Sequence, residues 1–469
     1  MSESSNSHVC TKGNGAWNVP YDIALLMEKW NEMRDNIMPF KRVAIAYSAV
    51  SAFFVMVSMA AWSGAVSASG FALLEQSGSG LGSAYAGATA SAEDASTIFF
   101  NPAGMAHLHG KQLAVAGYLI GVASQFSDIA SVAAAGRALG TVPDNGRKWV
   151  GVPNGYFAAE ITPKLHIGIG INTPFGSSTE YRADWIGRYQ ALKSSIETIN
   201  VNPSLSYQLN DAFSIGAGLD YQRFKATLTN VRILGPIDGT NTLSGSDNAW
   251  GYNIGGLMWL ADNARIGVSY RSAIQFNLAG TVYVSSALPV AGTNVSVPIT
   301  VGMNPPDTLS LGYFKPLDGK WDVMADLART GWSSFKELLV IQASAGATVA
   351  LTPENWSDTW RVAAGANYHY NEQWTARAGL AYDQSPVSDA FRTARIPDAD
   401  RTWLSLGGQY KTGKGSVLDF GYAHLFVKNS TVYKNKGGVN VASTALYAQL
   451  AGSYDCKADI LGVQYTYGF

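Results

Sequence analysis

From about residue 111 to the end of the chain, apolar and polar residues alternate with a period of two. The last segment shows this most clearly, because every second residue is apolar or aromatic and those between are small or polar. The two sets are Leu461, Val463, Tyr465, Tyr467 and Phe469, and Gly462, Gln464, Thr466 and Gly468. Successive side chains of a β-strand point to opposite faces. This segment is therefore predicted to be a strand with one apolar and one polar face.

The same alternation returns in residues 213–222 and 374–383. In the second of these segments the polar face carries Arg377 and Asp383. A charged side chain is costly in hydrocarbon, so this face is expected to point inward and the apolar face outward to lipid. The pattern is typical of a transmembrane β-barrel.

Short polar turns separate many of these segments, and several are flanked by aromatic residues, such as Tyr207 and Phe213. The turns are residues 162–164, 209–211, 261–263, 317–319, 371–373 and 412–414. Aromatic rings beside tight turns are expected where the barrel meets a membrane interface. If each turn joins two strands on the periplasmic side, and one strand is added at each end, the chain forms about fourteen antiparallel strands.

The remaining connections are longer and are predicted to be extracellular loops. They are residues 182–197, 234–248, 285–306, 342–358, 383–400 and 428–443. In the first of them, Trp185, Tyr189, Leu192 and Ile196 follow a helical spacing. We therefore expect a short amphipathic helix there, with an exposed apolar stripe where an apolar ligand could land.

Composition narrows the choice of fold class. Charged residues make up 14 % of the chain, aromatics reach 12 %, and 49 residues are glycine. A soluble globular protein has roughly 25 % charged residues, which disfavours the alternative of a soluble all-β protein. The mean hydropathy of +0.02 disfavours a bundle of apolar helices. A net charge of −1 without a basic block removes the case for nucleic acid.

The N-terminal region is predicted to be removed. Lys41 and Arg42 precede an apolar stretch that closes with Val66-Ser67-Ala68, as in a secretory signal peptide. A transmembrane anchor is the alternative. We expect three parts: residues 1–68, extension and cleaved signal peptide; residues 69–110, which lack period two; and residues 111–469, the barrel. A lumen of this width leaks unless it is filled, so residues 69–110 are expected to form an internal plug, here called the hatch.

Several motifs in order resemble one known family. They are Ser69-Gly70-Phe71, Ser79-Gly80-Leu81-Gly82, Ala84-Tyr85-Ala86-Gly87, Asn101-Pro102-Ala103-Gly104, Trp185-x-Gly187-Arg188-Tyr189, Asn202-Pro203-Ser204, Asp383-x-Ser385-Pro386-Val387 and Ile396-Pro397-Asp398-x-Asp400-Arg401. Together they resemble the FadL/TodX family of outer-membrane transporters for long-chain fatty acids and hydrocarbons. The resemblance implies an all-β fold, a fourteen-stranded antiparallel transmembrane barrel plugged by an N-terminal hatch, and location among outer-membrane lipids. The terminal Phe469 resembles the signal read by the outer-membrane assembly machinery.

The resemblance also implies a route. An apolar molecule lands on an outer groove, enters a pocket near Phe71 and Leu73 of the hatch, and leaves sideways through a kink in the third strand. That kink is expected to face Asn101, Pro102 and Ala103 of the hatch. The matching stretch here carries Pro174 and Gly176, and Pro cannot donate to a ladder. Either the strand breaks there, or Pro174 merely ends it.

The sequence leaves more than one class of cargo possible. The two basic residues that hold a fatty-acid head group in the family fall on Asn230 and Thr352 here, neither of which is basic. Arg232 and Arg361 lie close enough to replace them. Long-chain fatty acids, neutral or aromatic hydrocarbons, and a structural or adhesive barrel without transport are therefore the alternatives. The chain has no Gly-x-Ser-x-Gly nucleophile motif, and we expect neither an enzyme nor a metal or nucleotide cofactor.

Overall fold

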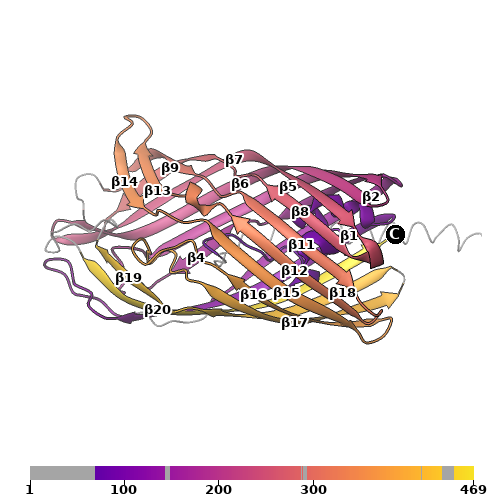
Figure 1. Cartoon of the computed structure of the whole chain (residues 1–469). Helices are drawn as coiled ribbons and strands as arrows, with labels where there is room; N and C mark the ends of the chain where they lie inside the picture. Colours follow the sequence, from indigo (N-terminus) through magenta and orange to yellow (C-terminus); the bar gives the residue numbers. More distant parts are fainter. Residues whose placement is uncertain (1–68, 143–147, 287, 289–292, 414, 436–447) are drawn as a thin grey trace, which may run out of the picture. The chain divides into compact units, whose positions relative to one another are not determined.

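A computed structural model of the chain describes residues 69–142, 148–286, 288, 293–413, 415–435 and 448–469. The predicted signal peptide and the extension before it lie outside these residues. The described residues form a closed antiparallel barrel of fourteen strands around an internal plug (Figure 1). Among them, no helix is long and apolar enough to cross a membrane.

Six of the fourteen strands are interrupted once, so the barrel consists of twenty strand segments. They are β1 (Lys111–Asp128), β2 (Lys148–Thr162), β3 (Leu165–Asn172), β4 (Gly176–Glu180), β5 (Lys193–Asn210), β6 (Phe213–Leu234), β7 (Ile237–Trp259), β8 (Arg265–Arg271), β9 (Phe276–Ser285), β10 (Ser296–Met303), β11 (Thr308–Pro316), β12 (Trp321–Thr330), β13 (Glu337–Gln342), β14 (Thr348–Pro353), β15 (Thr359–His369), β16 (Trp374–Asp383), β17 (Arg401–Gly413), β18 (Ser416–Val427), β19 (Ser430–Asn435) and β20 (Gln449–Gly468). The interrupted strands are β3/β4, β8/β9, β10/β11, β12/β13, β14/β15 and β18/β19. β1 pairs with β20, and this pairing closes the barrel.

All six predicted short turns join neighbouring paired strands, and the structure confirms them. One of their residues, Lys414, lies outside the described part of the chain. Three of these turns contain a short helix or a left-handed residue, namely η3 (Ala261–Asn263), and Gly319 and Gly413, each with φ +78°.

The predicted long loops are only partly irregular. The prediction for 234–248 is wrong, because β6 and β7 pair continuously from Phe213↔Met258 to Leu234↔Ile237. Strand segments also occur in 285–306, 342–358 and 428–443. Hairpins can extend beyond the bilayer because their backbone groups pair with each other whatever the solvent. A loop boundary therefore cannot be read from polarity alone.

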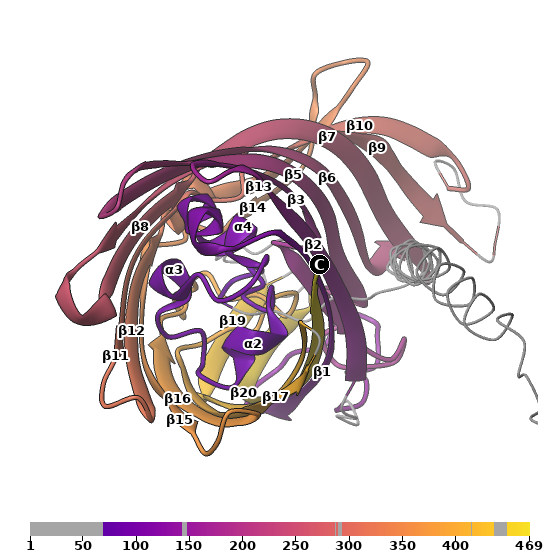
Figure 2. The same cartoon turned by 90° about the vertical axis from the view of Figure 1, so that its right-hand side faces the viewer.

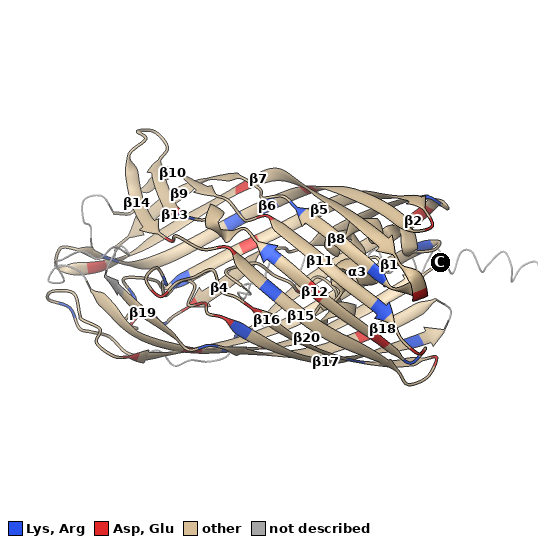
Figure 3. Ribbon diagram, viewed as in Figure 1, with Lys and Arg blue, Asp and Glu red and all other residues tan. Residues whose placement is uncertain are grey.

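The two faces of the strands are as predicted. Leu380 and Val463 are more than half exposed on the outside, whereas Arg377 and Gln464 are buried on the inside. Charged residues occur as scattered positions along the strands without a block of one sign (Figure 3). Their low density fits a barrel whose outer face contacts lipid.

The hatch lies inside the ring of strands, near the end where the chain terminates (Figure 2). It contains α2 (Gly78–Leu81), α3 (Ala88–Ser91), α4 (Thr97–Phe100) and η2 (Pro102–His107). Its backbone touches the wall where the wall has no side chains. A Cβ at Gly216 would lie 2.3 Å from the Ala103 nitrogen, and one at Gly379 would lie 2.2 Å from the Ser83 carbonyl.

These wall glycines come in cross-strand pairs. The pairs are Gly216↔Gly255, Gly267↔Gly312, Gly365↔Gly379 and Gly407↔Gly421. These glycines therefore leave space on the inner face of the wall for the backbone of the hatch, which explains part of the high glycine content of the sequence.

Candidate functional site

A cavity lies between the hatch and the wall, with an empty volume of about 1110 Å³ that includes its part open to solvent. The hatch contributes Leu73, Leu74, Tyr85, Phe99 and Phe100. The wall contributes Pro174, Phe175, Ile274, Arg271, Arg361, Asp326, Asp383 and several hydroxyl side chains. The cavity therefore joins an apolar surface to a polar one. This is the arrangement expected of a binding pocket for an amphipathic molecule.

Phe71 stands beside this pocket and is fully buried. Its ring contacts five other aromatic rings at centroid distances from 4.7 to 6.4 Å, namely Phe175, Phe224, Trp332, Phe335 and Trp356. Gly70 before it has φ +64° and donates its N–H to Asp398 at 2.8 Å. A side chain at Gly70 would strike Trp356, so the tight turn that seats Phe71 requires glycine.

The strand that carries Pro174 breaks between β3 and β4, which is the first of the two alternatives. Three residues, 173–175, stand opposite two on β5, since Asn172 pairs with Asn200 and Gly176 with Glu197. The extra residue is a bulge, which bends a strand and removes local pairing. The alternative that Pro174 merely ends the strand is wrong, because β4 resumes the ladder with β5.

The hatch takes over the backbone groups that the break sets free. The Leu73 N–H donates to the Pro174 carbonyl at 2.8 Å, and the Gly176 N–H donates to the Phe71 carbonyl at 2.8 Å. Gln76 donates to the Thr173 carbonyl at 2.8 Å. The start of the hatch therefore acts as a short strand added to the kink.

Among the described residues, the hatch groups hydrogen-bonded to the kink are Phe71, Leu73 and Gln76, whereas the hydrogen bonds of Asn101 go elsewhere. The Asn101 amide donates to the Thr89 carbonyl at 2.8 Å and to the Gly256 carbonyl of β7 at 3.0 Å. Its oxygen accepts from the Ala103 N–H and caps η2, whose first residue is Pro102. This Asn-Pro pair thus starts a 3-10 helix and fixes the hatch to β7.

The wall beside β4 has a seam. Among the described residues, β4 has ladder partners on β5 only, whereas β3 pairs with β2 as well as β5. Across the seam, the Lys148 ammonium contacts the Glu180 carboxylate at 2.7 Å. Beside the kink, the barrel wall is therefore joined by side chains instead of a backbone ladder.

Of the two arginines expected in the pocket, Arg361 lines it and Arg232 does not. Arg232 is exposed near the tip of the β6–β7 hairpin. Its placement was wrong because that hairpin extends farther than polarity indicated. Arg271, which the sequence did not single out, lines the pocket instead. It pairs with Asp220 and donates to the Phe99 carbonyl at 2.9 Å.

The predicted helix in residues 185–196 is also wrong. Residues 183–190 form turns, and β5 already begins at Lys193. Trp185 is fully buried, stacks on Tyr181 at 3.9 Å and donates to the Ala191 carbonyl at 2.6 Å. Tyr189 and Ile196 are buried too. No exposed apolar stripe exists in this loop, because its rings pack against other parts of the barrel.

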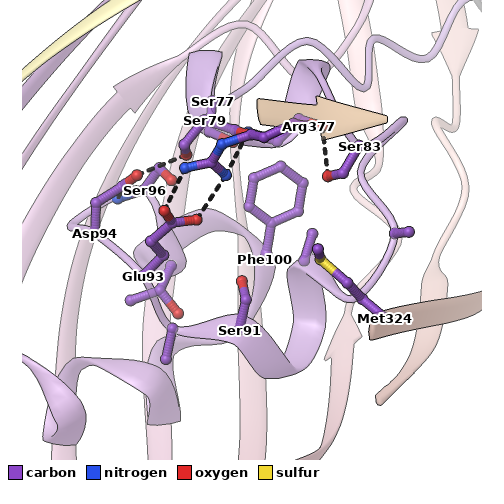
Figure 4. A pocket seen from close by; sticks show the side chains of 15 residues that line it. Ser77, Ser79, Ser83, Ser91, Glu93, Asp94, Ser96, Phe100, Met324 and Arg377 are labelled. Atoms are coloured by element: carbon purple, nitrogen blue, oxygen red, sulfur yellow. Dashed lines mark hydrogen bonds and ion pairs between the residues drawn. The ribbon is translucent and has the colours of Figure 1, made fainter. Parts of the chain in front are cut away.

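A second, smaller cavity lies among polar groups of the hatch (Figure 4). There Arg377 of β16 donates to the Glu93 carboxylate at 2.8 Å, to the Ser79 carbonyl at 2.9 Å and to Asp419 at 3.0 Å. Burial alone would raise the pKa of Glu93, but the Arg377 guanidinium outweighs it and holds this pKa below its ordinary 4.5. The polar cavity and the main pocket share only Ala88 and Phe100 in their linings.

The sequence missed the polar wall of the main pocket. Besides Arg271, it comprises Gln222, Ser269, Ser272, Thr308, Ser310, Asp326, Thr330 and Asp383. The sequence did contain a sign of these inward-facing residues. Ser269 and Arg271 occupy alternate positions of one strand, and Thr308 and Ser310 do so on another, so each pair shares a face. Nothing local indicated which inward positions lie above the hatch. Among the described residues, no group of three or more His, Cys, Asp or Glu side chains could hold a metal ion.

A closed barrel that is plugged from within and holds an amphipathic pocket against a break in its wall defines a plugged membrane channel. The family model described as outer membrane protein transport protein (OMPP1/FadL/TodX) matches residues 59–469. The chain therefore belongs to this family and is an outer-membrane protein.

The chain aligns with its relatives over nearly their whole length. The chain is 30 % identical over 452 residues to the long-chain fatty acid transport protein of Salmonella typhi, covering 90 % of this chain and 98 % of that protein. It is 30 % identical over 464 residues to the protein of the same name in Escherichia coli K12, with the same coverage. A Pseudomonas aeruginosa FadL homologue has the same fold, with a TM-score of 0.78 at 24 % identity over 85 % of this chain and all of that one. The toluene transporter TbuX of Ralstonia pickettii shares the fold with a TM-score of 0.62 at 18 % identity, also over 85 % of this chain and all of its own.

Proposed function

We propose that this protein takes up long-chain fatty acids or similar hydrophobic compounds across the outer membrane by passive diffusion, with lateral exit through the wall. The observation that carries the proposal is the pocket, whose lining runs from the hatch to Pro174 and Phe175 at the kink. A molecule in this pocket lies next to the break in the wall. The names of the relatives support the same cargo class.

Lateral exit suits the physics of the cargo. Releasing a fatty chain into the aqueous periplasm costs about 0.8 kcal/mol for each CH₂ group exposed. The neighbouring cavity in the hatch is polar, since its lining includes Ser77, Ser79, Glu93, Asp94 and Arg377. The seam beside β4 leads instead toward lipid. For the path to open, the Phe71–Leu73 segment must leave the kink.

Arg361 is the residue that we propose to bind a carboxylate head group. It is buried, lines the pocket and donates one N–H to the Ala84 carbonyl at 2.6 Å. Its Nε has no hydrogen-bond partner among the described residues. A buried guanidinium with a free donor favours an anion or another strong acceptor.

Neutral or aromatic hydrocarbons are the second candidate cargo. Asp326 and Asp383 line the same pocket as Arg361, which offsets its positive charge. Asn230 is not available either, since its amide donates to the Tyr189 and Val231 carbonyls. A barrel that never opens, with a structural or adhesive role, is the third candidate.

We further propose that residues 1–68 are removed on export, that residues 69–110 serve as the hatch of the barrel formed by 111–469, and that Phe469 is read during assembly. Transport needs no catalytic group and no cofactor in this scheme. The structure around Phe469 suits its role, because its backbone pairs with Lys111 at 2.9 and 3.1 Å as the barrel closes.

The test of transport is uptake of labelled oleate and labelled toluene by a strain that lacks the gene. We expect wild-type protein supplied on a plasmid to restore oleate uptake. Restoration of toluene uptake alone would favour the second candidate. Restoration of neither would contradict transport.

The test of lateral exit is a repaired strand. Deleting Phe175 and substituting Pro174→Val leaves two residues opposite two on β5, so a regular ladder can run from Asn172 to Gly176 without reversing the faces. We expect uptake to fall to the level of the deletion strain at equal amounts of protein in the membrane. The matched control, Pro174→Ala, keeps the extra residue and should keep uptake. Full uptake with the repaired strand would contradict the lateral route.

A further inference from the structure

Hydroxyl side chains line one wall of the pocket across three adjacent strands. Thr308 and Ser310 occupy alternate positions of β11, so they share a face. Ser310 is paired with Ser269 of β8, and Thr308 is paired with Thr330 of β12. All four residues line the main pocket. The wall is therefore a patch of hydroxyl groups and not an isolated polar residue.

The hydroxyl groups of this wall lack hydrogen-bond partners among the described residues. None of the four hydroxyl groups forms a hydrogen bond with another described residue. Two further side chains that line the pocket, Gln222 and Arg361, have a nitrogen atom without a partner in the described part of the chain, Nε2 and Nε respectively. Gln222 is 1 % exposed and Arg361 is 8 % exposed. Buried donors without partners are rare in native proteins and call for an explanation.

Inward-facing residues of a barrel are polar as a rule, but other hydroxyls of this lumen are occupied. Ser206 and Ser214 both donate to the Ala103 carbonyl, at 3.1 and 2.9 Å. They fix the hatch, whereas the four hydroxyls of the pocket wall contact no part of it by hydrogen bonds. Their free donors face the space that a ligand would fill.

The hatch side of the pocket is mostly apolar, with Leu73, Leu74, Phe99 and Phe100. An unsubstituted alkyl chain between the two sides would strip water from the hydroxyl wall and offer nothing in return, which is unfavourable. A chain with an oxygen atom along its length would replace those lost hydrogen bonds. The hydroxyl wall therefore distinguishes ligands by whether their chain carries an oxygen atom, and not by their size.

The spacing suits two oxygen positions on one ligand. Ser269, Ser310, Ala328 and Arg361 form one continuous cross-strand row over β8, β11, β12 and β15. Neighbouring strands lie about 4.8 Å apart, so Ser310 is about 10 Å and Ser269 about 14 Å from Arg361 along the wall. A long-chain acid held at Arg361 by its carboxylate would bring the middle of its chain to the hydroxyl groups.

We infer that the pocket prefers long-chain fatty acids that carry a hydroxyl group in the middle of the chain over unsubstituted acids of the same length. This inference rests on the proposed function, since it names the substrate class of the same pocket. The head group binds Arg361, and the mid-chain hydroxyl exchanges hydrogen bonds with Thr308, Ser310 and Ser269.

The experiment compares ricinoleic acid with oleic acid, which differ only by the mid-chain hydroxyl. Binding of each is measured by calorimetry on the purified full chain in detergent. We expect ricinoleate to bind about tenfold more tightly than oleate, the effect of one good hydrogen bond. In the double variant Thr308→Val and Ser310→Ala, this ratio should fall to about one.

The matched control is Thr402→Val, which changes a Thr on the lipid-facing side of β17 and should keep the ratio. If the double variant does not fold, as judged by heat-modifiable migration on gels, Ser269→Ala alone should reduce the ratio. Equal binding of the two acids by the wild-type protein would overturn the inference and leave the proposed function standing. An unchanged ratio in a folded variant would also overturn it. Binding of neither acid would overturn the proposed function, and this inference with it.

Discussion

At the scale of single residues, burial inside the hatch changes the chemistry of one carboxyl group. Glu75 is 1 % exposed, and one of its oxygen atoms has no partner among the described residues. Burial raises the pKa of Glu75 to about 7, although Arg401 and Arg361 act in the opposite direction. The hatch therefore holds a group that changes charge near neutral pH, beside the pocket-lining Tyr85.

The Glu75→Gln substitution tests this charge. The folded state favours the protonated carboxyl, so its contribution to stability is full below the ordinary pKa of 4.5 and is lost as pH rises toward about 7. The loss amounts to about 3 kcal/mol for a shift of this size. We expect urea unfolding in detergent to show lower stability at about pH 8 than at about pH 5, and the variant to show a smaller difference. Equal pH slopes in the two proteins would contradict the assignment.

At the scale of elements, the fit between hatch and wall depends on pairs of glycines on neighbouring strands. Gly365 and Gly379 are paired across β15 and β16, and both lie against Ser83 of the hatch. At the kink, an extra residue in the strand removes ladder hydrogen bonds. The backbone of the hatch then pairs with the strand groups that this leaves free. Each device lets the backbone of the hatch approach the backbone of a strand.

The Gly379→Ala substitution tests this contact. Its Cβ would lie 2.2 Å from the Ser83 backbone, so hatch or wall must shift, at a cost of about 1–3 kcal/mol. We expect a lower urea midpoint and a higher single-channel conductance in planar bilayers. The control is Gly117→Ala on the lipid-facing side, where a Cβ meets nothing within 4 Å. Equal conductance of the Gly379→Ala and Gly117→Ala variants would show that the hatch does not depend on this contact.

At the scale of the whole described barrel, the hatch is fixed on two sides and meets the kink on a third. Polar contacts hold it to β16, β17 and β20 through Arg377, Gln409 and Gln464. Asn101 holds it to β7. The segment at the kink depends on backbone hydrogen bonds and the rings around Phe71. The hatch can therefore stay in place as a plug while its first residues move.

The Arg377→Met substitution tests the plug. It removes the partner of Glu93 and Asp419, and breaking a buried pair in this way costs about 3–5 kcal/mol. We expect a leaking barrel, measured as increased sensitivity of cells to vancomycin. Because the pKa of Glu93 is held low, its contribution is present above pH 4.5 and is lost as pH falls through its lowered value. The isolated wild-type protein should therefore leak more in bilayers at pH values below 4.5 than at neutral pH. Arg377→Lys, which keeps the charge, should leak less than Arg377→Met, and equal leakage would contradict an ionic role.

The sequence by itself determined the barrel, its fourteen strands and the six tight turns, and it marked Pro174 as a place where the strand either breaks or ends. Each of these follows from local rules, because lipid outside and a polar interior impose alternation on every strand and Pro removes a ladder donor. The pocket was decided only by the tertiary structure. Arg271, Thr308 and Arg361 lie far apart in sequence and meet through strand order and register. The helix predicted from the spacing around Trp185 is absent for the same reason. The long-range packing of the Trp185 ring overrode a periodicity that is only local.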